Sequence, residues 1–79
     1  MKYSDLYRDR ILTLCKKRTI TLNRLSTMSG VSHSTLENIV KGKSANPKVI
    51  TLHKIAISFN MTLSEFLDFE ELNDYSFDN

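Results

Sequence analysis

Residues 30–42 read GVSHSTLENIVKG, and this stretch decides how the rest of the chain is interpreted. It is bracketed by the two glycines of the chain. Its apolar residues are few and spaced as on one side of a helix, and they are Val31, Leu36, Ile39 and Val40. A helix with one thin apolar stripe can be seated on a scaffold while its other side faces outward. The sequence therefore predicts a short helix that presents small hydrogen-bonding side chains to a partner.

The charge of the chain is divided unevenly along its 79 residues, a length that favours one domain. All eleven Lys and Arg lie in residues 1–67, which have a net charge of +7, whereas residues 68–79 hold five acids and no base. We therefore expect a basic body, residues 1–67, and an acidic tail, residues 68–79. A basic body attracts a polyanion such as nucleic acid, although a solvated surface is the alternative.

Cysteine content and hydropathy bear on location. A single cysteine cannot form an internal disulfide, and the sequence contains neither a long apolar run nor the core of a signal peptide. We expect a cytoplasmic protein without a membrane segment.

The sequence predicts helices throughout, because turn residues are few and no segment alternates like a strand. Ser4 or Asp5 can cap a first helix that ends near Arg18, where three basic residues suit the helix dipole. Four residues along this segment follow helical spacing, namely Tyr7, Ile11, Leu14 and Arg18.

The next two helices are short and joined by a tight turn. Thr21 can cap the second helix and Gly30 can end it in a left-handed conformation. Ser32 can then cap the third helix, which ends at Gly42. We expect their inner faces to hold Leu22, Leu25 and Met28 in the second helix and Leu36, Ile39 and Val40 in the third.

Two more helices complete the body. Pro47 suits the first turn of the fourth helix, and Asn60 suits its end. Residues 62–65, Thr-Leu-Ser-Glu, match a capping box that opens the fifth helix. The expected buried residues are Val49, Leu52, Ile55, Ala56 and Phe59 in the fourth helix and Leu63, Phe66 and Leu67 in the fifth.

The tail allows two interpretations. It either continues the fifth helix to about Leu72 or is mostly disordered. Several apolar residues give it a reason to dock on the body, namely Phe69, Leu72, Tyr75 and Phe77.

The second and third helices, with the turn at Gly30, have the dimensions of a helix-turn-helix. In that unit the second of the two helices lies in the major groove of DNA and the first crosses the backbone. Short polar side chains let a helix approach base edges closely. The outward residues of the helix at 32–41 fit this requirement, and they are Ser32, His33, Ser34, Thr35, Glu37 and Asn38.

From Arg10 to Leu67 the chain resembles the helix-turn-helix domain of the lambda-repressor/Cro-type family, also called the XRE family. The resemblance rests on an ordered set of residues: Ile11, Leu14, Thr21, Leu25, Gly30-Val31-Ser32, Ser34-Thr35-Leu36, Ile39, Gly42-Lys43, Asn46-Pro47, Thr51-Leu52, Ile55-Ala56 and Leu63. It implies an all-α, five-helix DNA-binding domain that binds double-stranded operator DNA. It further implies a twofold dimer on palindromic half-sites about 34 Å apart.

Three positions depart from the family pattern. Leu22 stands where members usually carry a Gln that grips a phosphate, so that contact is lost or replaced by Asn23 or Arg24. Thr19 stands where members often have Gly, which indicates a slightly different turn. Val40 stands where a charged residue is common.

The resemblance assigns roles to individual residues. Base edges would be read by Ser32, His33, Ser34, Thr35 and Asn38, and the amide of Asn38 can bond an adenine bidentately. We expect Glu37 to pair within its helix, because a carboxylate meets few base partners. Phosphates would be bound by Thr21, Asn23, Arg24, Lys41, Lys43 and Ser44, with Arg10 as a weaker candidate.

The expected function is a sequence-specific transcriptional regulator, and a repressor if it acts by occupying a promoter. The alternative is an antitoxin-like or other protein-interaction module on the same fold, with the acidic tail as the docking segment. No metal site, cofactor or enzyme is expected, because His33, His53 and Cys15 lack ligand spacing and no catalytic constellation is visible. Cys15 is expected near the surface.

Overall fold

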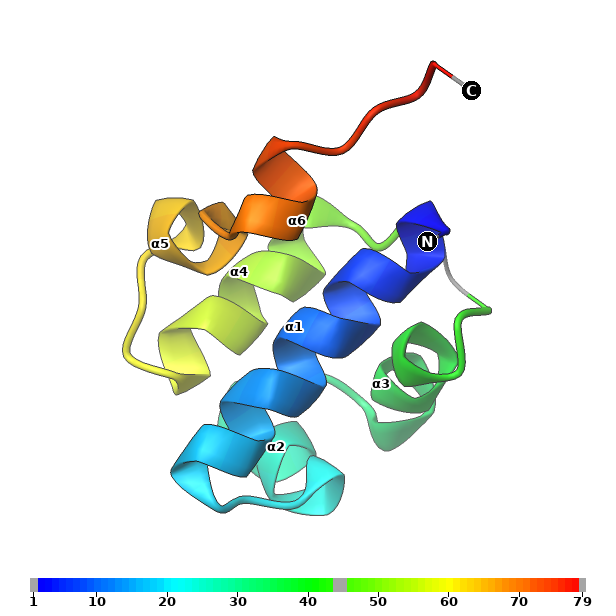
Figure 1. The fold of residues 1–79 in the computed structure, drawn as a ribbon. Helices are drawn as coiled ribbons and strands as arrows, with labels where there is room; N and C mark the ends of the chain where they lie inside the picture. Colours follow the sequence, from blue (N-terminus) through cyan, green and yellow to red (C-terminus); the bar gives the residue numbers. More distant parts are fainter. Residues whose placement is uncertain (1, 44–45, 79) are drawn as a thin grey trace.

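The computed structural model describes residues 2–43 and 46–78, and every regular element within them is a helix. In chain order these are α1 (Tyr3–Arg18), α2 (Leu22–Ser29), α3 (His33–Val40), α4 (Val49–Ser58), α5 (Leu63–Leu67) and α6 (Glu70–Asn73) (Figure 1). The prediction of an all-α fold with five helices in the body is confirmed. The short helix α6 is an addition to it.

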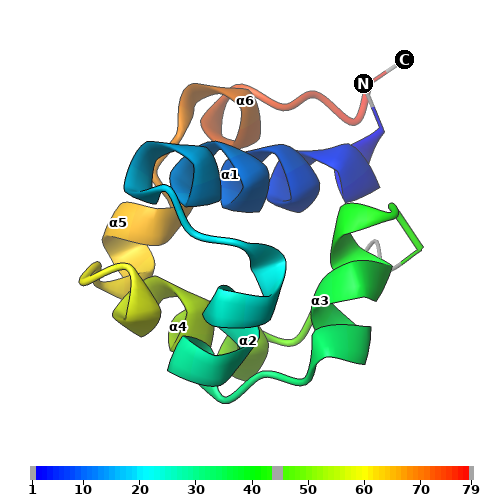
Figure 2. The same ribbon diagram turned by 90° about the horizontal axis from the view of Figure 1, so that it is seen from below.

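The helices enclose one apolar core. In Figure 2, α1 and α6 lie along one side, α2 and α4 lie opposite, and α3 and α5 occupy the two ends. The core draws on all of the first five helices, and its fully buried members include Ile11, Leu25, Leu36, Ile39, Ile55, Phe59 and Phe66. Each helix alone is too short to be stable in water, so burial of these side chains holds them together.

Helix α1 begins earlier than expected. Its N-cap is Lys2 and not Ser4 or Asp5, because the Asp5 carboxylate accepts a hydrogen bond from the backbone N–H of Lys2 at 3.3 Å. The helix ends at Arg18, as predicted. Thr19 then adopts the left-handed conformation, with φ 54°, and its backbone N–H donates to Cys15 and Lys16 carbonyls.

Two residues assigned to the core face outward instead. Met28 is 44% exposed and Val49 is 65% exposed. Each lies three residues from a buried leucine of its own helix, Leu25 or Leu52. A step of three residues leaves an offset of roughly 60° around the helix axis. On α2 the area of contact with the core is too narrow to include that offset. Val49 instead is the first residue of α4, and it is exposed although Ala56, two turns further along the same side, is buried.

At the ends of α4 and α5, one predicted boundary is wrong and the predicted capping box is confirmed. Pro47 precedes α4 and is not part of its first turn, because Lys48 has an extended backbone and the helix begins only after it. Asn60 adopts a left-handed conformation, with φ 59°, just beyond the end of α4. The predicted capping box is present: Thr62 N–H donates to Glu65 Oε1 at 2.8 Å, and Glu65 N–H donates to Thr62 Oγ1 at 3.0 Å.

The acidic tail follows neither of its two expected courses. Helix α5 ends at Leu67, and the chain then turns into the separate helix α6. Leu72 packs half-buried against the core. Beyond α6, the ring of Tyr3 lies 5.0 Å from that of Tyr75 and 5.5 Å from that of Phe77, centroid to centroid. The tail is therefore docked on the start of α1.

Candidate nucleic-acid interface

The turn between α2 and α3 is fixed by local hydrogen bonds. Gly30 has φ 75° and ends α2 as predicted. The Ser26 hydroxyl donates to the Val31 carbonyl at 2.6 Å, and the Val31 N–H donates to the Ser29 hydroxyl at 3.2 Å. These bonds join the last turn of α2 to the residue that precedes the cap of α3. The turn is thus held by hydrogen bonds of its own residues, and the packing of α3 against α1 and α2 positions the helix further.

Helix α3 has the predicted two-sided character. Leu36 and Ile39 have no exposed surface, and they seat the helix against the core beside α1 and α2. On the opposite side Ser34, Thr35 and Asn38 are exposed. The core does not cover these polar side chains, so they remain available to a ligand outside the molecule.

The first turn of α3 is capped as expected. The Ser32 hydroxyl accepts the Thr35 N–H at 3.2 Å and also donates to the Thr35 hydroxyl at 2.9 Å. One hydroxyl hydrogen, that of Thr35, is left over by this pair. Ser32 and Thr35 can therefore act on a ligand through one shared donor.

Glu37 pairs within its helix, as predicted. Its carboxylate lies 3.8 Å from His33 Nδ1 and 3.6 Å from Lys41 Nζ. Both neighbours are one turn away on the same side of α3, and all three side chains are 42% to 56% exposed. The pairing with Lys41 thereby offsets the negative charge that Glu37 would otherwise present to a polyanion.

The predicted phosphate ligands occupy the ends of the two helices. Thr21 caps α2 by accepting the Arg24 N–H at 3.1 Å, and the side chains of Asn23 and Arg24 are exposed beside it. Lys41 and Lys43 follow α3 and are also exposed. Ser44, the last predicted member of this group, lies outside the described residues.

A hollow of about 300 Å³ between α3 and the start of α4 brings further residues to this region. It is lined by Thr35, Ile39, Asn46, Pro47, Lys48 and Thr51. Sequence reasoning did not assign a role to Asn46, Lys48 or Thr51. The signal was present in the polar Asn-Pro-Lys sequence directly before a helix, but only the fold brings these residues next to Thr35.

Two arginines that could have served DNA are used inside the fold. Arg10 Nε donates to the Phe66 carbonyl at 2.9 Å, and a second guanidinium nitrogen donates to the Glu65 carbonyl at 3.0 Å. Its guanidinium carbon lies 5.0 Å from the centre of the Phe69 ring. Arg18 likewise donates to the Phe59 carbonyl at 2.7 Å. Arg10 is therefore a structural residue that holds the end of α5.

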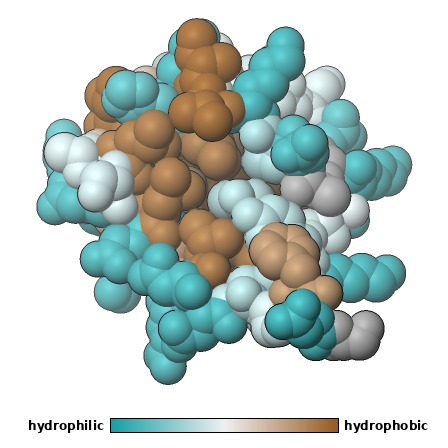
Figure 3. All heavy atoms as spheres, turned by 90° about the horizontal axis from the view of Figure 1, so that it is seen from above, coloured by the Kyte–Doolittle hydropathy of each residue, from teal (hydrophilic) through white to brown (hydrophobic). Residues whose placement is uncertain are grey.

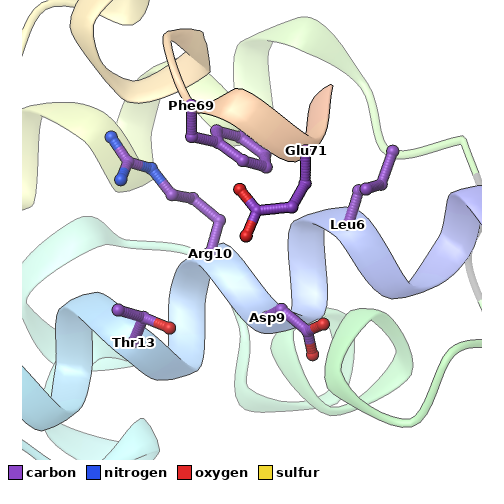
Figure 4. Close-up of a pocket in the computed structure, with 6 residues that line it drawn as sticks. All are labelled: Leu6, Asp9, Arg10, Thr13, Phe69 and Glu71. Atoms are coloured by element: carbon purple, nitrogen blue, oxygen red, sulfur yellow. The ribbon is translucent and has the colours of Figure 1, made fainter. Parts of the chain in front are cut away.

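A second hollow, of about 150 Å³, lies between α1 and α6. It is lined by Leu6, Asp9, Arg10, Thr13, Phe69 and Glu71 (Figure 4). In Figure 4 the Arg10 guanidinium is drawn beside Phe69, with Glu71 projecting from α6 on the other side. The hollow is small, and its arginine is already bonded to α5, so we assign no ligand to it.

Residues 2–43 and 46–78 contain no cluster of three or more His, Cys, Asp or Glu that could hold a metal ion. Cys15 is buried, which corrects the expectation of a thiol near the surface, and burial raises the pKa of this thiol. In the same described residues, no helix has the length and apolar character needed to cross a bilayer.

The chain belongs to the family of Cro/C1-type HTH DNA-binding domains, whose family model matches residues 10–71. The resemblance inferred from the sequence is thereby confirmed. It is similar to the HTH-type transcriptional regulator SlrR of Bacillus subtilis (strain 168), with 38% identity over 64 residues. That match covers 80% of this chain and 42% of SlrR, so the chain spans less than half the length of this relative.

A solved structure shows the same fold. The prophage Lp1 protein 11 superposes with a TM-score of 0.82 at 25% identity, covering 95% of this chain and 100% of that one. The helix-turn-helix of α2 and α3 is thus a DNA-binding unit by family, and the family is defined by binding and not by catalysis.

Proposed function

We propose that this protein is a sequence-specific transcriptional regulator that inserts α3 into the major groove of double-stranded DNA. The observation that carries the proposal is the division of α3 into a fully buried apolar stripe, Leu36 and Ile39, and an exposed polar side. A helix seated in this way can enter a groove without exposing apolar surface.

The residues proposed to read base edges are Ser32, His33, Ser34, Thr35 and Asn38. Asn38 is the strongest of them, because its side chain is exposed and makes no hydrogen bond within residues 2–43 and 46–78. Its amide can donate and accept at once, as an adenine edge requires. Ser32 and Thr35 contribute through the one donor that their mutual bond leaves over.

The residues proposed to bind phosphates form a border around α3. From the sequence these are Thr21, Asn23, Arg24, Lys41, Lys43 and Ser44. The hollow beside Thr35 supports adding Asn46, Lys48 and Thr51. Lys48 makes no side-chain cap for α4, so the first N–H groups of that helix and the lysine charge can both face a phosphate. Phosphate contacts would supply affinity and α3 would supply the choice of sequence.

We further propose that the protein acts as a repressor by occupying a promoter, in the cytoplasm, as a homodimer on a palindromic operator. No cofactor enters this proposal. The regulatory role is supported by the similarity to SlrR, a relative named as a transcriptional regulator.

A protein-interaction role, antitoxin-like or otherwise, is the second candidate. It is favoured by the tail, where Glu70, Glu71, Asp74 and Asp78 form no ion pair within the described residues. Replacing these four acids by their amides keeps the docked aromatic rings and removes only charge. Loss of a co-purifying basic partner would support the second candidate, whereas unchanged DNA repression would show that the tail charge is dispensable.

The test begins with selection of binding sites from random DNA, followed by titration of Asn38→Ala on the selected site and on random DNA. We expect a loss of about 1–3 kcal/mol on the selected site and a relaxed preference at one base pair. Thr13→Ala, an exposed polar residue on α1, is the matched control and should leave both affinities unchanged. Equal losses on both DNAs would refute the base-reading role of Asn38.

Lys43→Ala separates phosphate binding from base reading. We expect it to weaken binding to all sequences alike and to reduce the salt slope by about one unit. Lys54→Ala is the control and is titrated on a single half-site of DNA. Its affinity should be unchanged, because Lys54 lies on the outer side of α4. A loss limited to the selected site would instead assign Lys43 to a base.

A further inference from the structure

One side of α4 is apolar but uncovered. Val49 is 65% exposed, Ile50 is 62% exposed and Ile57 is 61% exposed. At 100° per residue these three side chains share one side of the helix with His53, and we call this set the α4 stripe. Lys54 lies next to it and forms no ion pair within residues 2–43 and 46–78. The α4 stripe is therefore an apolar surface with a positive border.

The end of the tail has the opposite character. Among the residues that the structure describes, Phe77 is the most exposed large apolar side chain, at 79%, although one side of its ring packs on Tyr3 and Tyr75. Asp74 and Asp78 flank these aromatic residues and have no ion-pair partner in the described part of the chain. The tail end is thus an apolar surface with a negative border.

Both surfaces reach the same face of the molecule. In Figure 1 the first turn of α4, α6 and the C-terminal segment lie together at the top. Figure 3 looks onto this face, and apolar side chains form a continuous band across it with hydrophilic groups on both sides. Val49 and Ile50 belong to that first turn of α4.

We propose that this face binds a second copy of the chain, with the α4 stripe of each copy packed against the tail end of the other. A twofold axis through the face would form both junctions at once, because each surface meets its complement. Charge complementarity selects a second copy over an unrelated apolar partner, since the positive and negative borders occur on one chain. An interface of standard size takes about 800 Å² from each partner, or about 15% of the 5240 Å² surface.

The inference rests on the proposed function only in linking the dimer to a palindromic operator. The face carries none of the residues of α3, so a dimer formed through it leaves both recognition helices free. Exchange of charges tests it directly. The first variant carries His53→Glu and Lys54→Glu, and the second carries Asp74→Lys and Asp78→Lys.

Each variant alone should lose self-association by about tenfold or more, because like charges meet at both junctions. In an equimolar mixture every junction again joins opposite charges, so association should return to near the wild-type level. Sedimentation equilibrium without DNA measures the self-association of each variant and of their mixture. The control is a variant with Lys16→Glu and Lys17→Glu on α1, which should associate like the wild type. Circular dichroism checks that the variants are folded.

A wild-type chain that sediments as a monomer at every accessible concentration would overturn the proposal. So would a mixture that associates no better than its components, or variants that associate like the wild type. Titration of the same variants on a single half-site keeps the two proposals apart. If the wild-type chain binds a half-site but does not self-associate, only the proposed dimer face is refuted. If it self-associates but does not bind a half-site, only the proposed DNA-binding role is refuted.

Discussion

Replacement of Arg10 by methionine tests what holds the last part of the body in place. The guanidinium of Arg10 joins α1 to the carbonyls of Phe66 and Glu65, and it lies over the Phe69 ring. Methionine keeps an unbranched apolar side chain of similar length but removes the charge and every donor. We expect Arg10→Met to fold but to unfold at a lower temperature than the wild type.

The size of the effect follows from the three contacts. The bond to Phe66 is partly buried, and a bond of this kind from a charged donor contributes about 1.5–3 kcal/mol. The bond to Glu65 is exposed, so water can replace it and little is lost. The stacking of the cation on Phe69 adds about 0.5–1 kcal/mol. A total loss of about 2–4 kcal/mol lowers the melting temperature of a domain of this size by roughly 10–30 °C.

Thermal unfolding followed by circular dichroism gives the melting temperature. DNA titration at several salt concentrations gives the salt slope of DNA binding. Arg8→Met is the matched control, because Arg8 bonds only to Asp5 and Asp9 on the surface of its own helix. We expect the control to change the melting temperature little. The reasoning about Arg10 is refuted if Arg10→Met melts like the wild type and instead reduces the salt slope of DNA binding by about one unit, as loss of a phosphate contact would.

Two further predictions concern single residues. Burial, and a hydrogen bond with Tyr3 at 3.1 Å, raise the pKa of Tyr7 to about 12, so the contribution of Tyr7 to the free energy of unfolding should be fully present below pH 10 and fall as the pH rises from 10 to 12. Denaturation of Tyr7→Phe should show a weaker fall in that window, and an identical fall would contradict the assignment. Thr19 holds a left-handed conformation that is strained for a β-branched residue by about 1–2 kcal/mol. Thr19→Gly should therefore raise stability by about 0.5–1 kcal/mol after the added freedom of the unfolded chain is subtracted, and a loss in urea unfolding would show that the strain is absent.

The features that the sequence predicts correctly are those set over a few neighbouring residues. Thr21, Ser32 and Thr62 each cap a helix by accepting the N–H three residues later, and that distance is fixed by the helix itself. Gly30 ends α2 because its backbone tolerates a positive φ. The candidate interface was predictable for the same reason, since two short helices with local caps and a turn lie within residues 21–42.

The wrong predictions of burial arise because periodicity identifies residues that share a side of a helix but not how much of that side the core covers. Met28 and Val49 lie at the edge of their apolar sides and remain exposed. The N-cap of α1 is Lys2 because Asp5, one of the two expected caps, lies in the first turn of the helix and its carboxylate accepts the backbone N–H of Lys2.

By itself the sequence determined the helices, the turn and the outward polar side of α3, because these depend on hydrogen bonds and spacings within a few residues. Only the tertiary structure decided the use of Arg10 and Arg18, which bond to carbonyls 56 and 41 residues away. It also decided that the tail docks on Tyr3 and that the α4 stripe is left uncovered. Contacts between distant segments depend on how the core packs, and no local pattern encodes which surfaces that packing brings together.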